Sequence, residues 1–171
     1  MADDPLASNR PNGVATPLIT DINGDHIADY IYAGDLFGNL WKIDVTDTNS
    51  SQWDFSFSSG SDPAPLYVAK DSNGVVQPIT SRPAVKRLSG HPTGMQVFFG
   101  TGKYIEQADK TDTTLQTFYS LSDDHTTAIS GRSDLLAQSI LDEVTVTAGS
   151  NTYKYRVTSN NQPGTNDRGW Y

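Results

Sequence analysis

The segment from Asp21 to Asp29 carries oxygen-bearing residues at the spacing of a calcium-binding loop. Calcium takes about six to eight oxygen ligands, and a short loop supplies them when the donors alternate along the chain. The predicted ligands are the side chains of Asp21, Asn23, Asp25 and Asp29 and the backbone carbonyl of Ile27. Three carboxylates nearly balance the charge of the ion. So many protein oxygens favour Ca²⁺ over Mg²⁺, which keeps several waters in its shell.

The loop differs from an EF-hand at two positions. His26 stands sixth, where that motif has glycine, and Tyr32 stands twelfth, where it has a bidentate glutamate. The flanking residues favour strands rather than helices, and Asp29 is the best candidate for the bidentate ligand. We expect His26 to take an unusual backbone angle.

The competing interpretation of this segment is a turn without metal, because Asp, Asn and Gly are also common in ordinary turns. Four oxygen-bearing side chains in register across the loop favour the metal site. Without an ion, the three carboxylates would repel one another.

Other polar residues form no recognisable site. His26, His91 and His125 make no His-x-x-x-His pair, so we expect neither zinc nor a catalytic triad and place all three at the surface. Trp41 is expected to pack between sheets rather than to stack on a sugar. The run from Gly100 to Lys103 lacks the spacing of a phosphate loop and predicts a tight turn after a buried strand.

Neighbouring carboxylates could pair for glycoside hydrolysis, but we interpret them as acids in solvated turns, since adjacent strand residues face opposite ways. They are Asp109 and Asp112, Asp123 and Asp124, and Asp142 and Glu143. No catalytic residue is predicted.

The composition indicates a cation-binding protein. A formal net charge of −8 and a pI near 4.6 argue against nucleic acid and anionic lipid as partners. The absence of cysteine excludes disulfides and thiolate chemistry. No run approaches the roughly 18 apolar residues of a membrane span. The opening residues lack the features of a signal peptide, so we expect any export signal to lie outside this chain.

The residues on either side of the loop predict an all-β fold in a single domain, residues 1–171, because short runs rich in Thr, Tyr and Val alternate with turn residues. The predicted strands are Val14–Thr20, Asp29–Ala33, Leu40–Val45, Leu66–Lys70, Val75–Ile79, Ala84–Leu88, Gln96–Gly100, Gln116–Ser120, Glu143–Ala148 and Tyr153–Thr158.

The segments between these strands are mostly predicted as turns and loops. Asp71–Gly74 is a hairpin signal, and Thr46–Ser51 and Ser56–Pro65 are polar loops. The apolar spacing of Ser133–Leu141 suits one short helix. Gly169–Tyr171 is expected to start a strand.

A faint internal repeat points to β-propeller blades. Tyr30–Gly34 followed by Trp41–Asp44 has a counterpart in Phe98–Gly100 followed by Phe118–Asp123. Units of about 40 to 50 residues with several strands are typical of propeller blades, which would give three or four blades. Because propellers commonly have four to eight, we expect a portion of a larger ring.

Three segments resemble the C-terminal propeller of the PilC/PilY-type tip adhesins of bacterial type IV pili. The most specific is Asp21–Asp44, in which the calcium loop runs into Gly-Asp-Leu-Phe-Gly-Asn-Leu-Trp; the others are Gln77–Val85 with Phe98–Tyr104, and Gln116–Asp123 with Gly169–Tyr171. His26 departs from the glycine usual in the loop of that family.

The resemblance implies a modified β-propeller at the cell surface, on the pilus tip or at the outer membrane. Its parent protein would take part in pilus biogenesis, adhesion and twitching motility, with calcium occupancy tuning pilus extension and retraction. The implied partners are minor pilins or a host surface reached through the parent protein. The large N-terminal adhesive region of the family is absent, so host attachment is not assigned to these residues.

Two other classes of function remain open from the sequence. A quinoprotein dehydrogenase also combines propeller blades with calcium, but here no cysteine pair and no cluster of active-site carboxylates accompanies them. A calcium-dependent carbohydrate-binding module is the other alternative. A redox assay with added quinone would test the first, and a glycan array with and without calcium the second.

Overall fold

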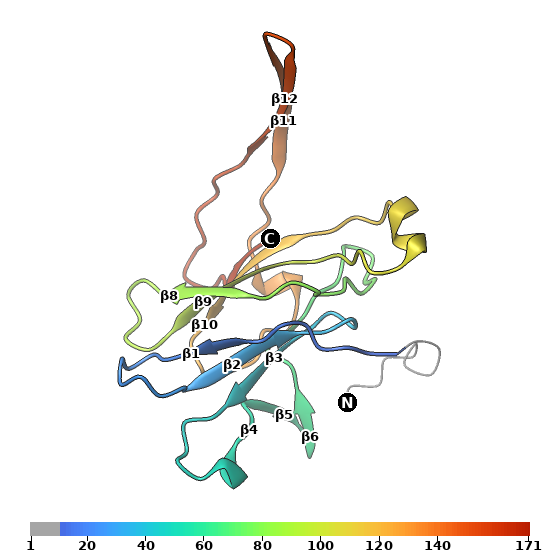
Figure 1. Cartoon of the computed structure of the whole chain (residues 1–171). Coiled ribbons are helices and arrows are strands. Elements are labelled where there is room, and N and C mark those ends of the chain that lie inside the picture. Colours follow the sequence, from blue (N-terminus) through green and yellow to red (C-terminus); the bar gives the residue numbers. More distant parts are fainter. Residues whose placement is uncertain (1–10) are drawn as a thin grey trace.

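The computed structural model describes residues 11–171, which form an all-β protein (Figure 1). The opening residues, where no export signal is predicted, lie outside this range. The strands are β1 Leu18–Thr20, β2 Tyr30–Gly34, β3 Asn39–Asp44, β4 Asp54–Phe55, β5 Phe57–Ser59, β6 Asp62–Ala64, β7 Tyr67–Val68, β8 Ala84–Arg87, β9 Met95–Gly100, β10 Phe118–Asp123, β11 Ile140–Ala148, β12 Asn151–Thr158 and β13 Gly169–Trp170. Short 3-10 turns occur at η1 Ser50–Gln52, η2 Gln107–Thr111 and η3 Arg132–Asp134.

The first sheet carries the predicted calcium loop between its strands β1 and β2. Its strands run in the order β1-β2-β3-β4, all antiparallel, and β7 also pairs with β3. The second sheet has the order β13-β10-β9-β8, so the last strand of the chain joins the sheet next to β10. The two central pairs, β2 with β3 and β9 with β10, correspond to the repeat expected from the sequence.

The hydrophobic core lies between the two sheets, because alternate side chains of each strand point into it. In β9, Met95, Val97 and Phe99 are buried while the residues between them are only partly buried. The rings of Phe99 and Tyr119 stack with centroids 5.1 Å apart. The buried members of the core are Tyr32, Leu40, Leu66, Tyr67, Ala69, Ile79, Met95, Val97, Phe99, Tyr119, Leu121, Ile129 and Leu135.

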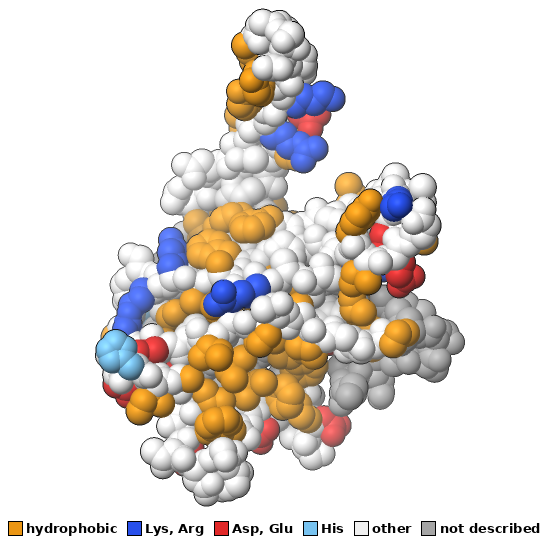
Figure 2. Space-filling model, in the orientation of Figure 1, with side chains coloured by type: hydrophobic (Ala, Val, Ile, Leu, Met, Phe, Trp, Pro, Cys, Tyr) orange, Lys and Arg blue, Asp and Glu red, His pale blue; other side chains and the backbone are white. Residues whose placement is uncertain are grey.

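Two hairpins complete the fold. β5 pairs with β6, and β11 pairs with β12 in a long ribbon that projects away from the body (Figure 1). Every residue of β11 and β12 is exposed. Figure 2 shows hydrophobic side chains along one side of this ribbon and charged side chains on the other.

Most of the predicted strands are present, and the predicted turn at Asp71–Gly74 is confirmed by the bond from the Gly74 N–H to the Asp71 carbonyl. The strand predicted at Val75–Ile79 is wrong. That segment makes only isolated bridges, Lys70 with Val76 and Ile79 with Gly102. Pro78 interrupts the segment, and its lack of an N–H prevents continuous pairing.

The helix predicted at Ser133–Leu141 is also wrong. The turn η3 covers Arg132–Asp134, and the Leu136 N–H then donates to the carbonyl of Gly169 in β13. Pairing with a strand that is distant in sequence therefore prevails over the apolar spacing, as tertiary context often does.

The predicted loop Ser56–Pro65 instead contains the β5–β6 hairpin, closed at Gly60, where φ is +65°. Glycine takes a positive φ without steric cost, which suits the tight turn. The number of blades was overestimated as well. Within residues 11–171 there are two sheets of four or more strands and two hairpins, not three or four blades.

Candidate calcium loop and the buried cluster beside it

The predicted calcium loop connects β1 to β2 at one end of the first sheet. The Asp29 N–H donates to the Thr20 carbonyl at 2.8 Å, so the two ends of the loop are held together by the sheet itself. The side chains of Asp21, Asn23 and Asp25 are exposed, whereas Asp29 is buried. An ion would therefore approach from the solvent side and meet Asp29 at the base of the loop.

Asp21 organises the first turn of the loop. One carboxylate oxygen accepts the Gly24 N–H at 2.6 Å, and the other accepts the His26 N–H at 2.8 Å. These bonds to Gly24 and His26 hold the pKa of the Asp21 carboxyl below its ordinary value, because they stabilise the ionised form. Asp21 is thus a carboxylate at neutral pH, as a calcium ligand must be.

The middle of the loop is wound by two further side chains. Asn23 Oδ1 accepts the Asp25 N–H at 2.8 Å, and Asp25 Oδ1 accepts the Ile27 N–H at 2.8 Å. Such bonds to the backbone two residues on are Asx turns. At the base, Asp29 Oδ2 accepts the Ile22 N–H at 2.7 Å.

Two residues of the loop lie in the left-handed region. Gly24 has φ +85° and His26 has φ +69°. The unusual backbone angle predicted for His26 is therefore confirmed. A non-glycine residue is strained in this conformation, and His, Asn and Asp are the residues that tolerate it best.

The donor set fits calcium in chemistry, with three carboxylates, one amide and one backbone carbonyl within nine residues. Across residues 11–171, however, no three His, Asp or Glu side chains are grouped closely enough to hold a metal ion. The carboxylates are instead engaged with backbone N–H groups of the loop.

The loop also contacts the second sheet. The guanidinium of Arg87, at the end of β8, donates to the Ile22 carbonyl inside the loop and to the Pro92 carbonyl. The side chain of Ile22 packs against the hydrophobic core. The conformation of the loop is thus held by contacts with both sheets.

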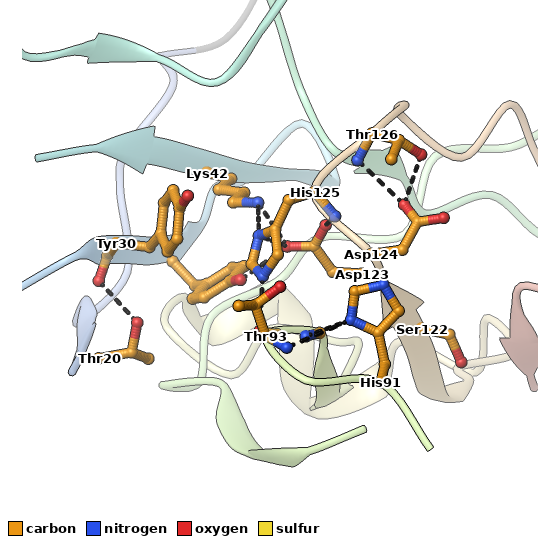
Figure 3. Close-up of polar contacts among 12 residues, drawn as sticks. Thr20, Tyr30, Lys42, His91, Thr93, Ser122, Asp123, Asp124, His125 and Thr126 are labelled. Carbon is orange, nitrogen blue, oxygen red and sulfur yellow. Dashed lines mark hydrogen bonds and ion pairs between the residues drawn. The ribbon is translucent and has the colours of Figure 1, made fainter. Parts of the chain in front are cut away.

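A cluster of charged and polar side chains is buried between the sheets near the end of β10 (Figure 3). Lys42 Nζ lies 2.8 Å from Asp123 Oδ2, with the two side chains 1% and 0% exposed. The Tyr32 hydroxyl donates to the same oxygen at 2.7 Å. Burial lowers the pKa of Lys42, and the neighbouring Asp123 opposes that shift. Burial also raises the pKa of Tyr32.

His125 closes this cluster on the side of the loop. Its Nδ1 is hydrogen-bonded to Lys42 Nζ, and its Nε2 to the Thr93 carbonyl at 2.8 Å. The imidazole stacks on the Tyr30 ring with centroids 4.8 Å apart. Because Tyr30 directly follows Asp29, the cluster touches β2, the strand that follows the predicted calcium loop.

These contacts correct two expectations. His125 was expected at the surface and Asp123 in a solvated turn, yet both belong to the interface between the sheets. The alternation in β10 was the available signal, since Tyr119, Leu121 and Asp123 share one face. Among the other histidines, His26 is exposed and His91 is partly buried, its Nδ1 accepting the Gly94 N–H at 2.7 Å.

The remaining carboxylates of these neighbouring pairs differ from one another in burial and in ion-pair partners. Asp109 is buried, contrary to expectation, and pairs with Lys103 at 2.7 Å. Asp112 is exposed, and Asp124 is partly buried, pairing with Arg168. Asp142 and Glu143 lie on the exposed ribbon rather than in a turn. Asp109, Asp124 and Glu143 each pair with a basic side chain.

The Gly-Asp-Leu-Phe-Gly-Asn-Leu-Trp segment folds around the buried side chain of Asp35. Asp35 Oδ2 accepts the Trp41 indole N–H and the Asn39 amide N–H, each at 2.8 Å. Trp41 is buried, but on the outer face of the first sheet against Phe55, rather than between the two sheets as expected. Leu40 and Lys42 point the other way, towards the second sheet, as the alternation predicted.

Comparisons of the sequence and of the structure with known proteins all point to the same family. A family model described as the PilY1 beta-propeller domain matches residues 7–156. The type IV pilus biogenesis factor PilY1 of Pseudomonas aeruginosa is 38% identical over 192 residues, covering 94% of this chain and 16% of that protein. A PilY1 homolog of Xylella fastidiosa is 34% identical over 130 residues, covering 75% of this chain and 9% of its own length.

The fold agrees with this family. The crystal structure of the Pseudomonas aeruginosa PilY1 C-terminal domain superimposes with a TM-score of 0.76 at 35% identity, covering 95% of this chain and 39% of that one. The all-β fold expected from the sequence, built from blades of a modified β-propeller, is therefore confirmed. The chain spans less than a fifth of the length of the Pseudomonas aeruginosa relative. In the described part of the chain, no helix is long and apolar enough to cross a bilayer.

Proposed function

Because the chain belongs to the PilY1 beta-propeller family, we propose that it is a calcium-binding module of a type IV pilus-associated surface protein. The module is a portion of a larger propeller and acts without catalysing a reaction. Calcium occupancy of the loop regulates pilus biogenesis, extension and retraction, and through them twitching motility and adhesion. The module works at the cell surface or pilus tip, in contact with other pilus components.

The observation that carries the calcium assignment is the geometry of residues 21–29. Alternating oxygen donors wind the backbone through two left-handed residues, Gly24 and His26, and the sheet closes the loop at Asp29. Strained residues of this kind often mark functional sites. An ion that neutralised the three carboxylates would offset both the strain and their mutual repulsion.

Calcium would act on this protein by linkage. A ligand that binds only the folded state and is present at about 100 times its dissociation constant stabilises that state by about 2.7 kcal/mol. The loop contacts both sheets through Ile22 and Arg87, so calcium binding would also stabilise the packing of one sheet against the other. The buried cluster of Lys42 and Asp123 is fully enclosed and supports a structural role for these charges.

Thermal melts in calcium, magnesium and chelator test the calcium assignment. We expect calcium to raise the melting temperature of the wild-type chain by roughly 5 to 10 °C, and magnesium to have a much smaller effect. Asp25→Ala removes one ligand and should abolish the calcium response.

The matched control is Asp142→Ala, which removes a carboxylate of the exposed ribbon outside the loop. It should keep the full calcium response. Equal melting temperatures for the wild type in calcium, magnesium and chelator would contradict the assignment.

A further inference from the structure

A pocket of about 600 Å³ lies where the chain leaves β7 and where it forms the turn η3. Pockets that bind small molecules in proteins are typically about 300–1,000 Å³, so this one is large enough for a small organic ligand. No residue of the predicted calcium loop lines it. The lining side chains that matter for its chemistry are those of Tyr67, Lys70, Asp71, Arg132 and Tyr171.

The guanidinium of Arg132 is held in place with one nitrogen left over. Its Nε and Nη2 both donate to the Tyr119 hydroxyl, at 3.2 and 2.9 Å, and Nη2 also donates to Thr117 Oγ1 at 2.7 Å. The guanidinium lies over the Tyr171 ring, 4.3 Å from its centroid, in a cation–π contact. Among residues 11–171, Nη1 has no acceptor. Its N–H groups are therefore available to a ligand.

Tyr67 adds a buried hydroxyl that lacks a partner. The side chain is 1% exposed, and no described residue forms a hydrogen bond with its hydroxyl. The neighbouring Tyr119 hydroxyl is already engaged, since it donates to Gln77 and accepts from Arg132. Burial raises the pKa of the Tyr67 hydroxyl, so it stays protonated and can donate. Buried polar groups are normally satisfied, and an acceptor bound in the pocket would supply what the chain does not.

Two charged side chains of opposite sign complete the lining. Lys70 is exposed and pairs with no carboxylate of the described chain. Asp71 Oδ1 accepts the N–H groups of Asn73 and Val75, each at 2.8 Å, whereas its Oδ2 receives no bond from residues 11–171. Lysine and arginine only donate hydrogen bonds, and an ionised carboxylate only accepts them. The pocket thus combines two cationic donors with one free acceptor oxygen.

We propose that this pocket binds a hydroxylated carboxylate of about the size of a uronic acid. The ligand carboxylate accepts from Arg132 and Lys70, and a ligand hydroxyl donates to Asp71 Oδ2. The pocket attracts an anion although the chain carries a formal net charge of −8, because its two cations outnumber its one carboxylate. A neutral sugar would leave the cations unpaired, and a bare anion would leave Asp71 without a donor.

This inference goes beyond the proposed calcium module and does not depend on it. An NMR titration of the isotopically labelled chain with sodium galacturonate tests it, with galactose and sodium acetate as separate arms. Galactose lacks the carboxylate, and acetate lacks the hydroxyls. All titrations contain chelator, so failure of the calcium response in the melts leaves this outcome unaffected.

Lys70→Gln removes one cation of the pocket at an exposed position, where the fold should tolerate the change. Lys110→Gln is the matched control, because Lys110 is also exposed and does not line the pocket. A galacturonate trimer separates the two sources of this chemistry. Tighter binding of the trimer than of the monomer assigns the ligand to an acidic polysaccharide, and equal binding assigns it to a free sugar acid; both support the proposal.

We expect galacturonate to cause saturable shifts of the amide signals around the pocket, and galactose and acetate to bind much more weakly. Lys70→Gln should weaken galacturonate binding at least about threefold, with Lys110→Gln unchanged. The absence of saturable shifts with galacturonate would overturn the inference, as would equal affinities of the wild type and Lys70→Gln. Galactose or acetate binding as tightly as galacturonate would overturn it too.

Discussion

Asp21, Asn23 and Asp25 show how far single residues can be interpreted from their spacing. Their alternation predicted a loop wound around oxygen donors, and each of them accepts at least one backbone N–H of that loop. The strained angle of His26 was also foreseen, because its place in the spacing is one that glycine normally fills. Calcium binding itself stays a prediction.

Other residues could not be placed from their neighbours in sequence. Asp123 precedes Asp124, and such a pair is typical of a solvated turn, yet Asp123 pairs with Lys42, 81 residues earlier in the numbering of the chain. Asp109 pairs with Lys103, six residues earlier, and nothing in the sequence pointed to this nearer pair either. Long-range pairing of this kind leaves little trace in local composition.

Asp109 gives a prediction for acid stability. The ammonium of Lys103, then the backbone N–H groups of Glu106 and Ile105, lower the pKa of Asp109 to about 2 from an ordinary value of 3.8. Because the folded-state pKa is the lower one, the ionised carboxylate stabilises the fold above pH 4, and this contribution is lost as the pH falls towards 2.

The variant Asp109→Asn should therefore be less stable than the wild type at pH 5 and lose that difference near pH 2. Urea unfolding at a series of pH values measures both. Asp142→Asn, on the exposed ribbon, is the control and should differ little from the wild type. A stability difference for Asp109→Asn that stays constant from pH 5 to pH 2 would contradict the assignment.

At the scale of secondary-structure elements, strands with clear alternation were predictable and elements defined by distant pairing were not. β3 and β9 occur where their alternation places them. The serine-rich hairpin of β5 and β6 lacks such a pattern. Leu136 lies in a segment with helical spacing but is not helical, because its backbone N–H is bonded to the carbonyl of Gly169 in β13. Pairing with another strand determines the structure of these segments, and the local sequence pattern does not reveal which strand that is.

The buried cluster joins elements of the two sheets, because Lys42 belongs to β3 and Asp123 to β10. Asp123→Ala would leave the Lys42 ammonium buried without its partner, which typically costs about 3 to 5 kcal/mol. We expect the free energy of unfolding, measured in urea, to fall by that amount. Glu143→Ala breaks the exposed pair with Arg156 and should cost less than about 1 kcal/mol.

Comparable losses for the buried and the exposed pair would contradict a role for the cluster in holding the sheets together. A double variant that replaces both Lys42 and Asp123 by apolar residues sharpens the measurement. It should recover part of the loss, because no unpaired charge then remains in the core.

At the scale of the whole molecule, the predicted calcium loop joins two strands of the first sheet. Ile19 precedes the loop in β1 and Ile31 follows it in β2, and the two residues are paired across these strands. An ion that ordered the loop would also fix the two strands that it joins.

A crystal structure of this chain grown in millimolar calcium, with anomalous scattering recorded, tests the central claim most directly. We predict one anomalous peak in the loop, with oxygens of Asp21, Asn23, Asp25, Ile27 and Asp29 about 2.3–2.6 Å away. A loop that holds only water under these conditions, with its carboxylates still bonded to the backbone N–H groups, would contradict the account.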